Sequence, residues 1–363
     1  QKQPAISGGA KNVLIIGSST GYGLASRITA AFGCGANTLG VFFERPGTDK
    51  KTASAGFYNA AAFDDLARAK GLYAESINGD AFSNECKQQV IQTLKSGIGK
   101  VDLVVYSLAS PRRTDPTTQI TYQSVLKPIG QAYTAKNLNT DTLKINEITL
   151  ESASDDEIAA TVKVMGGEDW QLWLEALADA DLLAEGVKTV AYTYLGEKIT
   201  WPIYGKATIG KAKEDLDRAA IEINQGLGKI NGQANVAVLK SLVTQASSAI
   251  PIMPLYISLL YKVMKEEGSH EGCIEQLYRL FTEGLYTPSP RLDGQSRLRM
   301  DDKELAEHVQ AKGAALWPEV TEENLFQLTD YKGYNADFLK LFGFGVQGVD
   351  YHADVSPEVS VKF

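Results

Sequence analysis

The sequence is poor in the residues that build disulfide frameworks and metal sites. It has three cysteines and three histidines in 363 residues, and neither type is clustered. An odd, widely spaced set of cysteines argues against a disulfide framework and indicates a reducing compartment. The sequence also lacks CxxC and HExxH patterns, which are the usual signatures of zinc sites. We therefore predict a cytoplasmic protein without a metal.

An excess of positive charge is absent as well. The chain has 36 Lys and Arg against 44 Asp and Glu, for a net charge of −8. Bulk binding to nucleic acid needs a basic face, so we exclude this class of partner. A phosphate-bearing ligand would have to be held locally, by backbone amides or by a few lysines and arginines.

Long apolar runs are missing too. The longest apolar stretch, "SSAIPIMPLYISLLYKVM" at 247–264, contains two prolines. It falls short of the about 20 apolar residues that span a bilayer. The opening "QKQPAISGGAKN" has no apolar core of a signal peptide. We expect 247–264 to be a buried helix or a pocket wall, and we expect no membrane partner.

What the sequence does contain is a regular alternation of strand and helix patterns. Short apolar runs that end at turns are typical of buried parallel strands, and they lie at 12–17, 38–44, 72–79, 101–109, 187–195 and 234–244. Helical patterns lie between them, at 22–32, 61–71, 83–97 and 208–225. Such alternation indicates βαβ units. We predict an α/β fold, a Rossmann-type doubly wound parallel sheet similar to short-chain dehydrogenases.

The regular alternation is interrupted twice. Residues 110–186 are polar and turn-rich, with some helix near their end, and residues 251–345 are mostly helical. We predict a single domain over 1–363, with a Rossmann core at about 11–109 and 187–250. The large insertion and the extra C-terminal helices would then build the substrate pocket. The late run "GVDYHADV" at 348–355 is a candidate seventh strand.

A glycine-rich turn joins the first strand to the first helix. It reads "GSSTGYG" at 17–23, which is GxxxGxG and not the GxGxxG of the older dinucleotide fingerprint. Glycines let the backbone approach a pyrophosphate, and the helix N-terminus offers free amides to it. The alternative is a tight turn without a ligand. Its place at the first strand–helix junction favours a dinucleotide site.

The ends of the following strands would complete that site. Glu44 ends the second strand, where a carboxylate can accept hydrogen bonds from the adenosine ribose hydroxyls. Arg45 could instead meet the 2′-phosphate of NADPH, but the adjacent acid repels that phosphate, so we favour NADH. Residues 80–81 and 108–109 end the third and fourth strands, near the expected adenine and nicotinamide ribose. Each of these is also readable as an ordinary strand-end residue.

The stretch "YGKATIGKAK" places Tyr204 and Lys213 nine positions apart. Nine residues of one helix turn by about 900°, which puts its two ends on opposite faces. We therefore predict Tyr204 in a loop, Thr208 as the helix N-cap and Lys213 in the second turn. Hydride transfer to a carbonyl or a conjugated thioester builds charge on oxygen, to which a phenol can donate. A nearby ammonium would lower the pKa of that phenol. The alternative is a packed tyrosine and a solvated lysine.

Several motifs together resemble the FabV-type trans-2-enoyl-thioester reductases. They span nearly the whole chain and read "GSSTGYGLASRITAAFG", "YSLASPRRTDP", "VMGGEDW", "ITWPIYGKATIGKAKEDLD", "VTQASSAIP" and "MKEEGSHEGCIEQLYRLF". The family's catalytic motif is a tyrosine and a lysine with eight residues between them, which Tyr204 and Lys213 match. Family members begin with a further N-terminal segment, so we expect this sequence to start later than theirs.

The resemblance implies the activity and the site residues. It implies NADH-dependent reduction of the C2–C3 double bond of enoyl thioesters on acyl carrier protein or CoA in fatty-acid biosynthesis, by a monomer. Tyr204 would be the proton donor, Lys213 would bind the cofactor, and Tyr194 would bind the substrate. The other NADH-binding residues would be Gly17, Ser18, Ser19, Thr20, Gly21, Tyr22, Phe43, Glu44, Asp80, Ala81, Leu108, Ala109, Leu242, Val243 and Thr244.

Two alternatives remain open from the sequence. A short-chain carbonyl reductase would place its tyrosine and lysine one helical turn apart, which this spacing does not do. A non-catalytic NAD-binding sensor would bind NADH without turnover. For an acidic carrier protein, the candidate docking cations near the site are Arg112, Arg113, Lys206 and Lys211. Each of these is also readable as a solvated surface charge.

Overall fold

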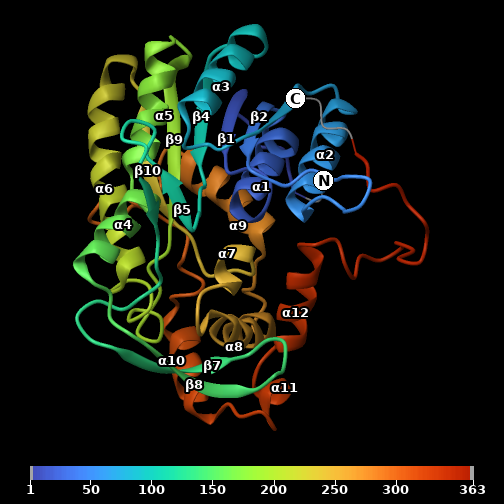
Figure 1. Ribbon diagram of the computed structural model, residues 1–363, viewed down its shortest axis with the longest axis vertical. Coiled ribbons are helices and arrows are strands. Elements are labelled where there is room, and N and C mark those ends of the chain that lie inside the picture. Colours follow the sequence, from blue (N-terminus) through green and yellow to red (C-terminus); the bar gives the residue numbers. More distant parts are fainter. Residues whose placement is uncertain (1–2, 360–363) are drawn as a thin grey trace.

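The computed structural model describes residues 3–359 and is built around a seven-stranded sheet. The paired strands are parallel throughout, in the order β11-β10-β9-β4-β1-β2-β3. The strands are β1 (Asn12–Ile16), β2 (Asn37–Phe42), β3 (Ala74–Asn78), β4 (Val101–Tyr106), β9 (Leu183–Thr193), β10 (Gln233–Val238) and β11 (Leu298–Arg299). This order confirms the predicted doubly wound α/β fold (Figure 1).

Helices cover both faces of the sheet, because successive strand residues are apolar and buried on both sides. Leu14 and Ile16 pack toward one face, while Val13 and Ile15 pack toward the other. The first face is covered by α3 (Asn84–Ser96), α5 (Glu168–Asp179) and α6 (Thr208–Leu227), with the 3₁₀ turn η2 (Gly228–Ile230) after α6. The second carries α1 (Gly21–Ile28), α2 (Ala55–Arg68), α9 (Cys273–Arg279) and the π-helical turns η1 (Thr29–Gly33) and η3 (Leu280–Leu285).

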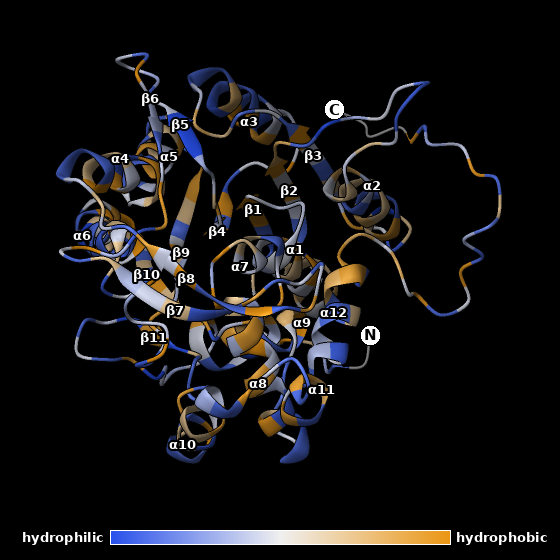
Figure 2. Ribbon diagram, turned by 60° about the horizontal axis from the view of Figure 1, so that its bottom comes forward, coloured by the Kyte–Doolittle hydropathy of each residue, from blue (hydrophilic) through white to orange (hydrophobic). Residues whose placement is uncertain are grey.

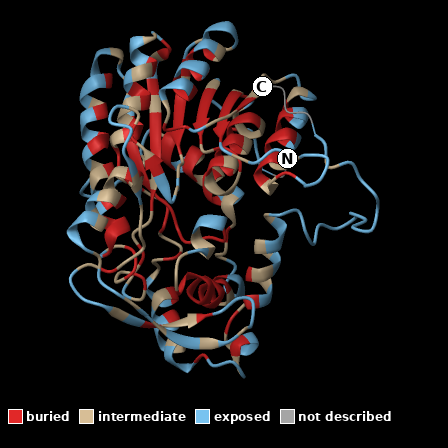
Figure 3. Cartoon of the chain, viewed as in Figure 1, coloured by how far each residue is buried: buried red, intermediate tan, exposed pale blue. Residues whose placement is uncertain are grey.

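A second apolar layer lies below the carboxyl edge of the sheet, and we call it the cap. Its centre is α8 (Met253–Glu266), which is buried over most of its length (Figure 3). Around it lie α7 (Gln245–Ser248), the hairpin of β7 (Tyr133–Leu138) and β8 (Ile145–Leu150), α10 (Glu307–Leu316), η4 (Trp317–Glu319), α11 (Leu325–Leu328) and α12 (Tyr331–Lys340). The apolar stretch at 247–264 is therefore the buried wall that the sequence predicted.

The polar segment between β4 and β9 contains more structure than its sequence suggested. The expected helices near its end are α4 (Asp155–Met165) and α5. The two tryptophans of α5, Trp170 and Trp173, are fully buried against the sheet layer. The structure adds the hairpin of β5 (Arg112–Thr114) and β6 (Thr121–Gln123), together with the β7–β8 hairpin of the cap. The strands β5 and β6 have three residues each, and β7 and β8 are mostly exposed or half-buried, so neither hairpin shows the continuous apolar run of a buried strand.

The prediction of a seventh strand at 348–355 is wrong. These residues are turns and irregular backbone, and they belong to an exposed arm that stands away from the body after α12 (Figure 2). The arm returns to α2, where the Tyr58 hydroxyl donates to the Pro357 carbonyl at 2.8 Å. The seventh strand is β11, whose Leu298 pairs with Ala237 of β10. A two-residue strand carries no period for the sequence to display.

Two absences concern the described part of the chain. Within residues 3–359, no helix combines the length and apolarity needed to cross a membrane. The same residues contain no cluster of three or more His, Cys, Asp or Glu side chains arranged to hold a metal ion. The three cysteines, Cys34, Cys86 and Cys273, are unpaired thiols.

A buried ion pair holds α1 and α2 against the sheet. The Arg27 guanidinium is fully buried and donates to the Asp64 carboxylate at 2.8 Å. It also donates to the hydroxyls of Thr38 and Ser76 on β2 and β3. Removing one partner of such a pair leaves the other charge buried and uncompensated. Because α1 follows the glycine-rich turn, this pair also fixes the position of that turn.

We predict that Asp64→Ala lowers the free energy of unfolding by about 3–5 kcal/mol, the usual loss when a buried ion pair loses one partner. Urea unfolding followed by far-UV circular dichroism measures this change. The matched control is Asp65→Ala. Asp65 follows Asp64 on α2, and its side chain is 73% exposed. Equal losses in the two variants would contradict a special role for the buried pair.

Candidate active site

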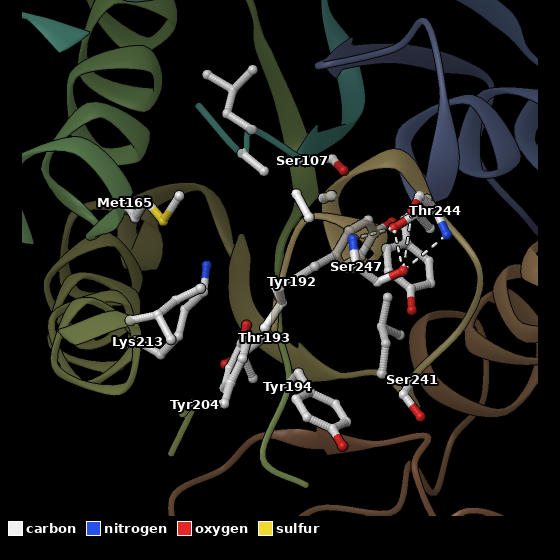
Figure 4. A pocket seen from close by; sticks show the side chains of 18 of the residues that line it. Ser107, Met165, Tyr192, Thr193, Tyr194, Tyr204, Lys213, Ser241, Thr244 and Ser247 are labelled. Atoms are coloured by element: carbon white, nitrogen blue, oxygen red, sulfur yellow. Dashed lines mark hydrogen bonds between the residues drawn. The ribbon is translucent and has the colours of Figure 1, made fainter. Parts of the chain in front are cut away.

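A pocket of about 470 Å³ opens between the carboxyl edge of the sheet and the cap. Its walls are mostly apolar and come from the loops after β4, β9 and β10, from α6, and from the α7–α8 region (Figure 4). Crevices at the carboxyl ends of parallel strands are the usual ligand sites of doubly wound sheets. The predicted residues Tyr22, Leu108, Ala109, Tyr194, Tyr204, Lys213, Leu242 and Thr244 all line it.

The glycine-rich turn is as tight as the sequence predicted. Gly17 has φ +88°, and a Cβ atom there would collide with the Ser107 carbonyl. A Cβ on Gly23 would collide with the Gly17 carbonyl, so the first turn of α1 can pack onto the loop only with glycine there. Thr20 precedes α1 without a side-chain capping bond, which leaves the first-turn amides as donors. A dinucleotide phosphate fits this helix N-terminus.

The strand-end residues predicted for the adenosine half lie beside this loop. The Glu44 carboxylate accepts a hydrogen bond from the Ser19 hydroxyl at 2.7 Å, and the Phe43 ring is 76% exposed. Asp80 is exposed, whereas Ala81 is buried and its carbonyl accepts from Lys87 and Trp173. An acid at the tip of β2 beside the phosphate turn suits the ribose hydroxyls of NADH. The glycine-rich loop and Glu44 therefore fit the adenosine half of the cofactor, whereas the assignments of Asp80 and Ala81 remain predictions.

The residues after β10 form the opposite wall of the pocket. β10 ends at Val238, so Leu242, Val243 and Thr244 lie in a loop and not in the strand that the sequence predicted. Thr244 caps α7, where its hydroxyl accepts from the Ser247 amide at 3.0 Å. Leu242 and Thr244 face the pocket, while Val243 is buried behind them and packs in the cap.

Tyr204 lies in the turn before α6, as predicted. Its side chain is 7% exposed, and its hydroxyl has no hydrogen-bond partner among the residues that the structure describes. The neighbouring Tyr194 ring packs against it in a T-shaped pair, with ring centroids 4.9 Å apart and planes at 88°. Figure 4 shows both rings at the pocket wall near Thr193. An unpaired phenol in an apolar pocket is placed to donate to a ligand.

Lys213 reaches the same pocket from the second turn of α6. The predicted cap is wrong in detail, because Ala207 precedes the helix and Thr208 is its first residue. The Thr208 hydroxyl instead donates to the Val125 carbonyl at 2.5 Å. The Lys213 ammonium makes no hydrogen bond or ion pair within residues 3–359. Burial lowers its pKa to about 8, although the nearby Asp217 charge opposes that shift.

The expected electrostatic link between the two residues is not present. We expected Lys213 to lower the pKa of Tyr204. In the structure, burial raises the pKa of Tyr204, and Lys213 is not among the groups that shift it. Without ligand the phenol is therefore held protonated, as a proton donor must be. The cost of removing a phenolate from water depends on burial, which the spacing of Tyr204 and Lys213 in the sequence does not show.

Three polar residues of the site were not predicted from the sequence. Thr193 and Ser241 line the pocket with buried hydroxyls that have no partner in the described structure. Glu304 is fully buried below the pocket, and its carboxylate accepts from the Tyr194 hydroxyl at 2.7 Å. Thr193 could have been predicted as a site residue, because it ends the strand β9. The sequence around Glu304, "DDKELAEH", looks like an ordinary charged turn.

The docking cations proposed from the sequence behave differently from one another. Arg113 is 2% exposed and donates to Glu168 at 2.8 Å, so it is not available to a partner. Arg112 and Lys206 are exposed, and Lys206 stacks over the Trp201 ring. Lys211 is exposed but paired with Glu214 on the same helix. The prediction that Arg113 is a docking cation is therefore wrong. Its side chain turns into the α4–α5 region, which the sequence alone does not show.

The sheet order, the glycine-rich turn and the pocket that contains both Tyr204 and Lys213 define a dinucleotide-dependent oxidoreductase. Three family models match the chain. Residues 51–286 match the trans-2-enoyl-CoA reductase catalytic region, and residues 1–49 match the NAD(P)H binding domain of trans-2-enoyl-CoA reductase. Residues 292–355 match a model described as the enoyl reductase FAD binding domain. The chain belongs to the trans-2-enoyl-CoA reductase family.

Relatives agree in sequence and structure. The chain is 72% identical over 361 residues to an enoyl-[acyl-carrier-protein] reductase [NADH] of Saccharophagus degradans, covering 99% of this chain and 91% of the relative. A trans-2-enoyl-CoA reductase of Clostridium acetobutulicum, solved with NADH, has a TM-score of 0.95 at 45% identity and covers 98% of this chain and 90% of its own. The trans-2-enoyl-CoA reductase of Treponema denticola, solved with NAD, has a TM-score of 0.92 at 52% sequence identity. The match covers 96% of this chain and 87% of that one.

The segment at 292–355 does not fit a flavin. Its buried carboxylates and Thr329 already have partners, since Arg299 donates to Asp301, Tyr194 donates to Glu304, and the Thr329 hydroxyl donates to the Leu325 carbonyl. The buried hydroxyl of Tyr334 on α12 is the exception, because it has no partner in the described structure. Its helices α10, α11 and α12 begin after Ala306, Asn324 and Asp330, without a glycine-rich phosphate turn. Neither the pocket nor the polar cleft beside it has a wall residue from this segment.

The lowered pKa of Lys213 predicts a pH-dependent affinity for NADH. A lysine with a pKa of about 8 loses its charge above that pH. If Lys213 binds the cofactor ribose as predicted, this interaction weakens as the pH rises from about 7 to about 9. We expect the Kd for NADH, measured by fluorescence titration, to rise about tenfold over this interval, which is the usual value of one charge-assisted hydrogen bond.

Two variants check the origin of this pH effect. Lys213→Met should bind NADH more weakly at pH 7 and show no further change up to pH 9. Lys211→Met is the matched control, because Lys211 lies two residues earlier on α6 and points to solvent. It should keep the pH dependence of the wild type. A pH dependence that survives in Lys213→Met would show that another group carries it.

Proposed function

We propose that this protein is an NADH-dependent reductase of trans-2-enoyl thioesters in fatty-acid biosynthesis, with Tyr204 as proton donor and Lys213 as cofactor ligand. One observation carries the proposal. The Tyr204 hydroxyl and the Lys213 ammonium reach one apolar pocket, beside the uncapped N-terminus of α1, and neither has a partner in the described structure. Family membership favours this reaction over a carbonyl reductase and over a non-catalytic NAD sensor.

The proposed mechanism divides the work among the residues of the pocket. NADH supplies a hydride, which adds to C3 of the conjugated thioester. The Tyr204 hydroxyl donates a hydrogen bond to the thioester oxygen, where negative charge gathers as the C2–C3 double bond is lost. A proton then reaches C2, with Tyr204 as its source. Lys213 holds the nicotinamide ribose hydroxyls, so that the carbon that gives the hydride faces C3.

The pocket walls suit an acyl chain. Leu126, Met165, Ile250 and Met253 line it with apolar side chains. The unpaired hydroxyls of Thr193 and Ser241 lie at the end of β9 and in the loop after β10. Such walls exclude water from the reacting atoms, which strengthens the hydrogen bond from Tyr204 to the thioester oxygen. An acyl chain bound here would leave its thioester beside Tyr204 and Tyr194. Tyr194 would then contact the thioester mainly through its ring.

We predict that Tyr204→Phe lowers kcat for crotonyl-CoA by about 10²- to 10⁴-fold, the usual contribution of a proton donor. NADH oxidation is followed by absorbance, and NADH affinity should stay within a factor of about two, because the phenol contributes to the transition state and not to cofactor binding. Tyr286→Phe is the matched control, since it removes a buried, unpartnered hydroxyl away from the pocket. Full activity in Tyr204→Phe would exclude Tyr204 as the donor.

The carrier of the acyl group is the finer part of the proposal. Relatives are named as enoyl-[acyl-carrier-protein] and as trans-2-enoyl-CoA reductases, so both carriers are candidates. We infer that an acidic carrier protein docks on the exposed cations Arg112 and Lys206, which border the loops around the pocket. The three unpaired thiols suit a reducing cytoplasm, and we infer that the enzyme acts there as a monomer.

We predict that the double charge reversal Arg112→Glu/Lys206→Glu raises the KM for an enoyl-acyl-carrier-protein about tenfold, while it changes the KM for crotonyl-CoA less than about threefold. The reason is that rim charges act mainly on the encounter with a charged protein partner. Lys95→Glu is the control, because Lys95 is exposed in the last turn of α3. This end of the helix lies at the amino ends of the strands, away from the pocket at their carboxyl ends. Equal effects on both substrates would contradict this docking site.

A further inference from the structure

Glu304 is a buried carboxylate that ties together three walls of the active site. It is fully buried, and its Oε1 accepts from the Tyr194 hydroxyl at 2.7 Å and from the Tyr256 hydroxyl at 2.9 Å. Its Oε2 accepts from the Ser241 amide at 2.5 Å. The three donors come from the loop after β9, from α8 and from the loop after β10. One side chain therefore joins the sheet edge to the cap.

The position of Glu304 is itself fixed. It lies in the turn between β11 and α10, and its carbonyl accepts from the Gln310 side chain at 2.7 Å. Gln310 also donates to the Tyr256 hydroxyl at 3.1 Å. Burial raises the pKa of Glu304, and its hydrogen bonds and the positive charge of the fully buried Lys240 oppose that shift. Lys240 makes no ion pair in the described structure. The carboxylate is thus anchored at both ends, by its own backbone and by its three donors.

This arrangement gives the two tyrosines of the pocket different tasks. The Tyr194 hydrogen is committed to Glu304, so Tyr194 does not donate to a substrate oxygen while that bond stands. The Tyr194 ring packs in a T-shaped pair against the Tyr204 ring (Figure 4). The Tyr204 hydroxyl itself has no partner in the described structure. A ring held in this way restricts the rotation of its neighbour. The distance from the Tyr204 oxygen to the reacting atoms then depends on the Glu304–Tyr194 bond.

We propose that Glu304 is a positioning residue for the reduction, which acts through Tyr194 to hold Tyr204 at the thioester oxygen. The proposal rests on the proposed function of Tyr204. It assigns a catalytic contribution to the C-terminal segment, which contributes no wall to the pocket. Glu304 does not touch the substrate or the cofactor in this account. Its contribution appears in the rate and not in cofactor affinity.

A double-mutant cycle tests this coupling. Glu304→Gln, Tyr194→Phe and the double variant are compared with the wild type for kcat with crotonyl-CoA, and NADH affinity is measured on each protein. Glu304→Gln should lower kcat by at least about tenfold. The upper limit is about 100-fold, which is the usual loss when a catalytic group is misplaced by a small distance. In the Tyr194→Phe background the same substitution should lower kcat less than about twofold, because the bond through which it acts is already gone.

Controls separate positioning from general loss of structure. Glu271→Gln neutralises another buried carboxylate, one that pairs with Arg279 and Lys303 and not with Tyr194. It should lower the melting temperature without the tenfold loss of kcat. If Glu304→Gln does not fold, Glu304→Asp enters the same cycle, because it keeps the charge and shortens the reach to Tyr194.

The outcomes distinguish this inference from the proposed function. Losses of kcat that multiply in the double variant would overturn the inference, since Glu304 would then act independently of Tyr194. The inference would also fall if Glu304→Gln raised the Kd for NADH and left kcat unchanged. A wild type that does not reduce crotonyl-CoA or longer enoyl thioesters would instead overturn the proposed function.

Discussion

The structure depends on the parallel pairing of its central strands. The register aligns Tyr106 of β4 with Ala191 of β9, and Thr193 of β9 with Val238 of β10, so these strands end at one edge. Strands in this arrangement are hydrogen-bonded from both sides, and the residues after each strand are directed to the same crevice. The glycine-rich turn and the loops after β4, β9 and β10 therefore surround one pocket, although they lie up to 227 residues apart along the chain, between Gly17 and Thr244.

Burial sets the chemistry of that pocket. Tyr204, Thr193 and Ser241 are buried at the pocket and Lys213 is half-buried there, and their side-chain polar atoms have no protein partner in the described structure. Polar groups buried in this way cost free energy unless a ligand satisfies them, which is why such groups mark functional sites. Burial also keeps the Tyr204 phenol protonated and makes the Lys213 ammonium easier to deprotonate. The neighbouring Tyr194 differs, since Glu304 takes its hydrogen bond.

The sequence predicted the elements whose pattern is local. The apolar runs gave six of the strands of the sheet, and the turn at 17–23 gave the phosphate loop, because period and glycine placement are set by neighbouring residues. Features set by distant contacts were missed. Glu304 and Arg113 look like surface charges until the fold buries them, and β11 exists only because β10 offers an open edge at Ala237. The assignments of the individual NADH-binding residues remain predictions.

The central claim is that hydride passes from the nicotinamide directly to C3 of the enoyl thioester, while C2 takes its proton through Tyr204. The most direct measurement is the position of deuterium in the reduced product, read by NMR. The account predicts one deuterium at C3 from NADH deuterated at the transferred position in ordinary water, and one at C2 from unlabelled NADH in D₂O. Loss of the C3 label to solvent in the first reaction would contradict direct transfer, and with it the arrangement of the pocket proposed above.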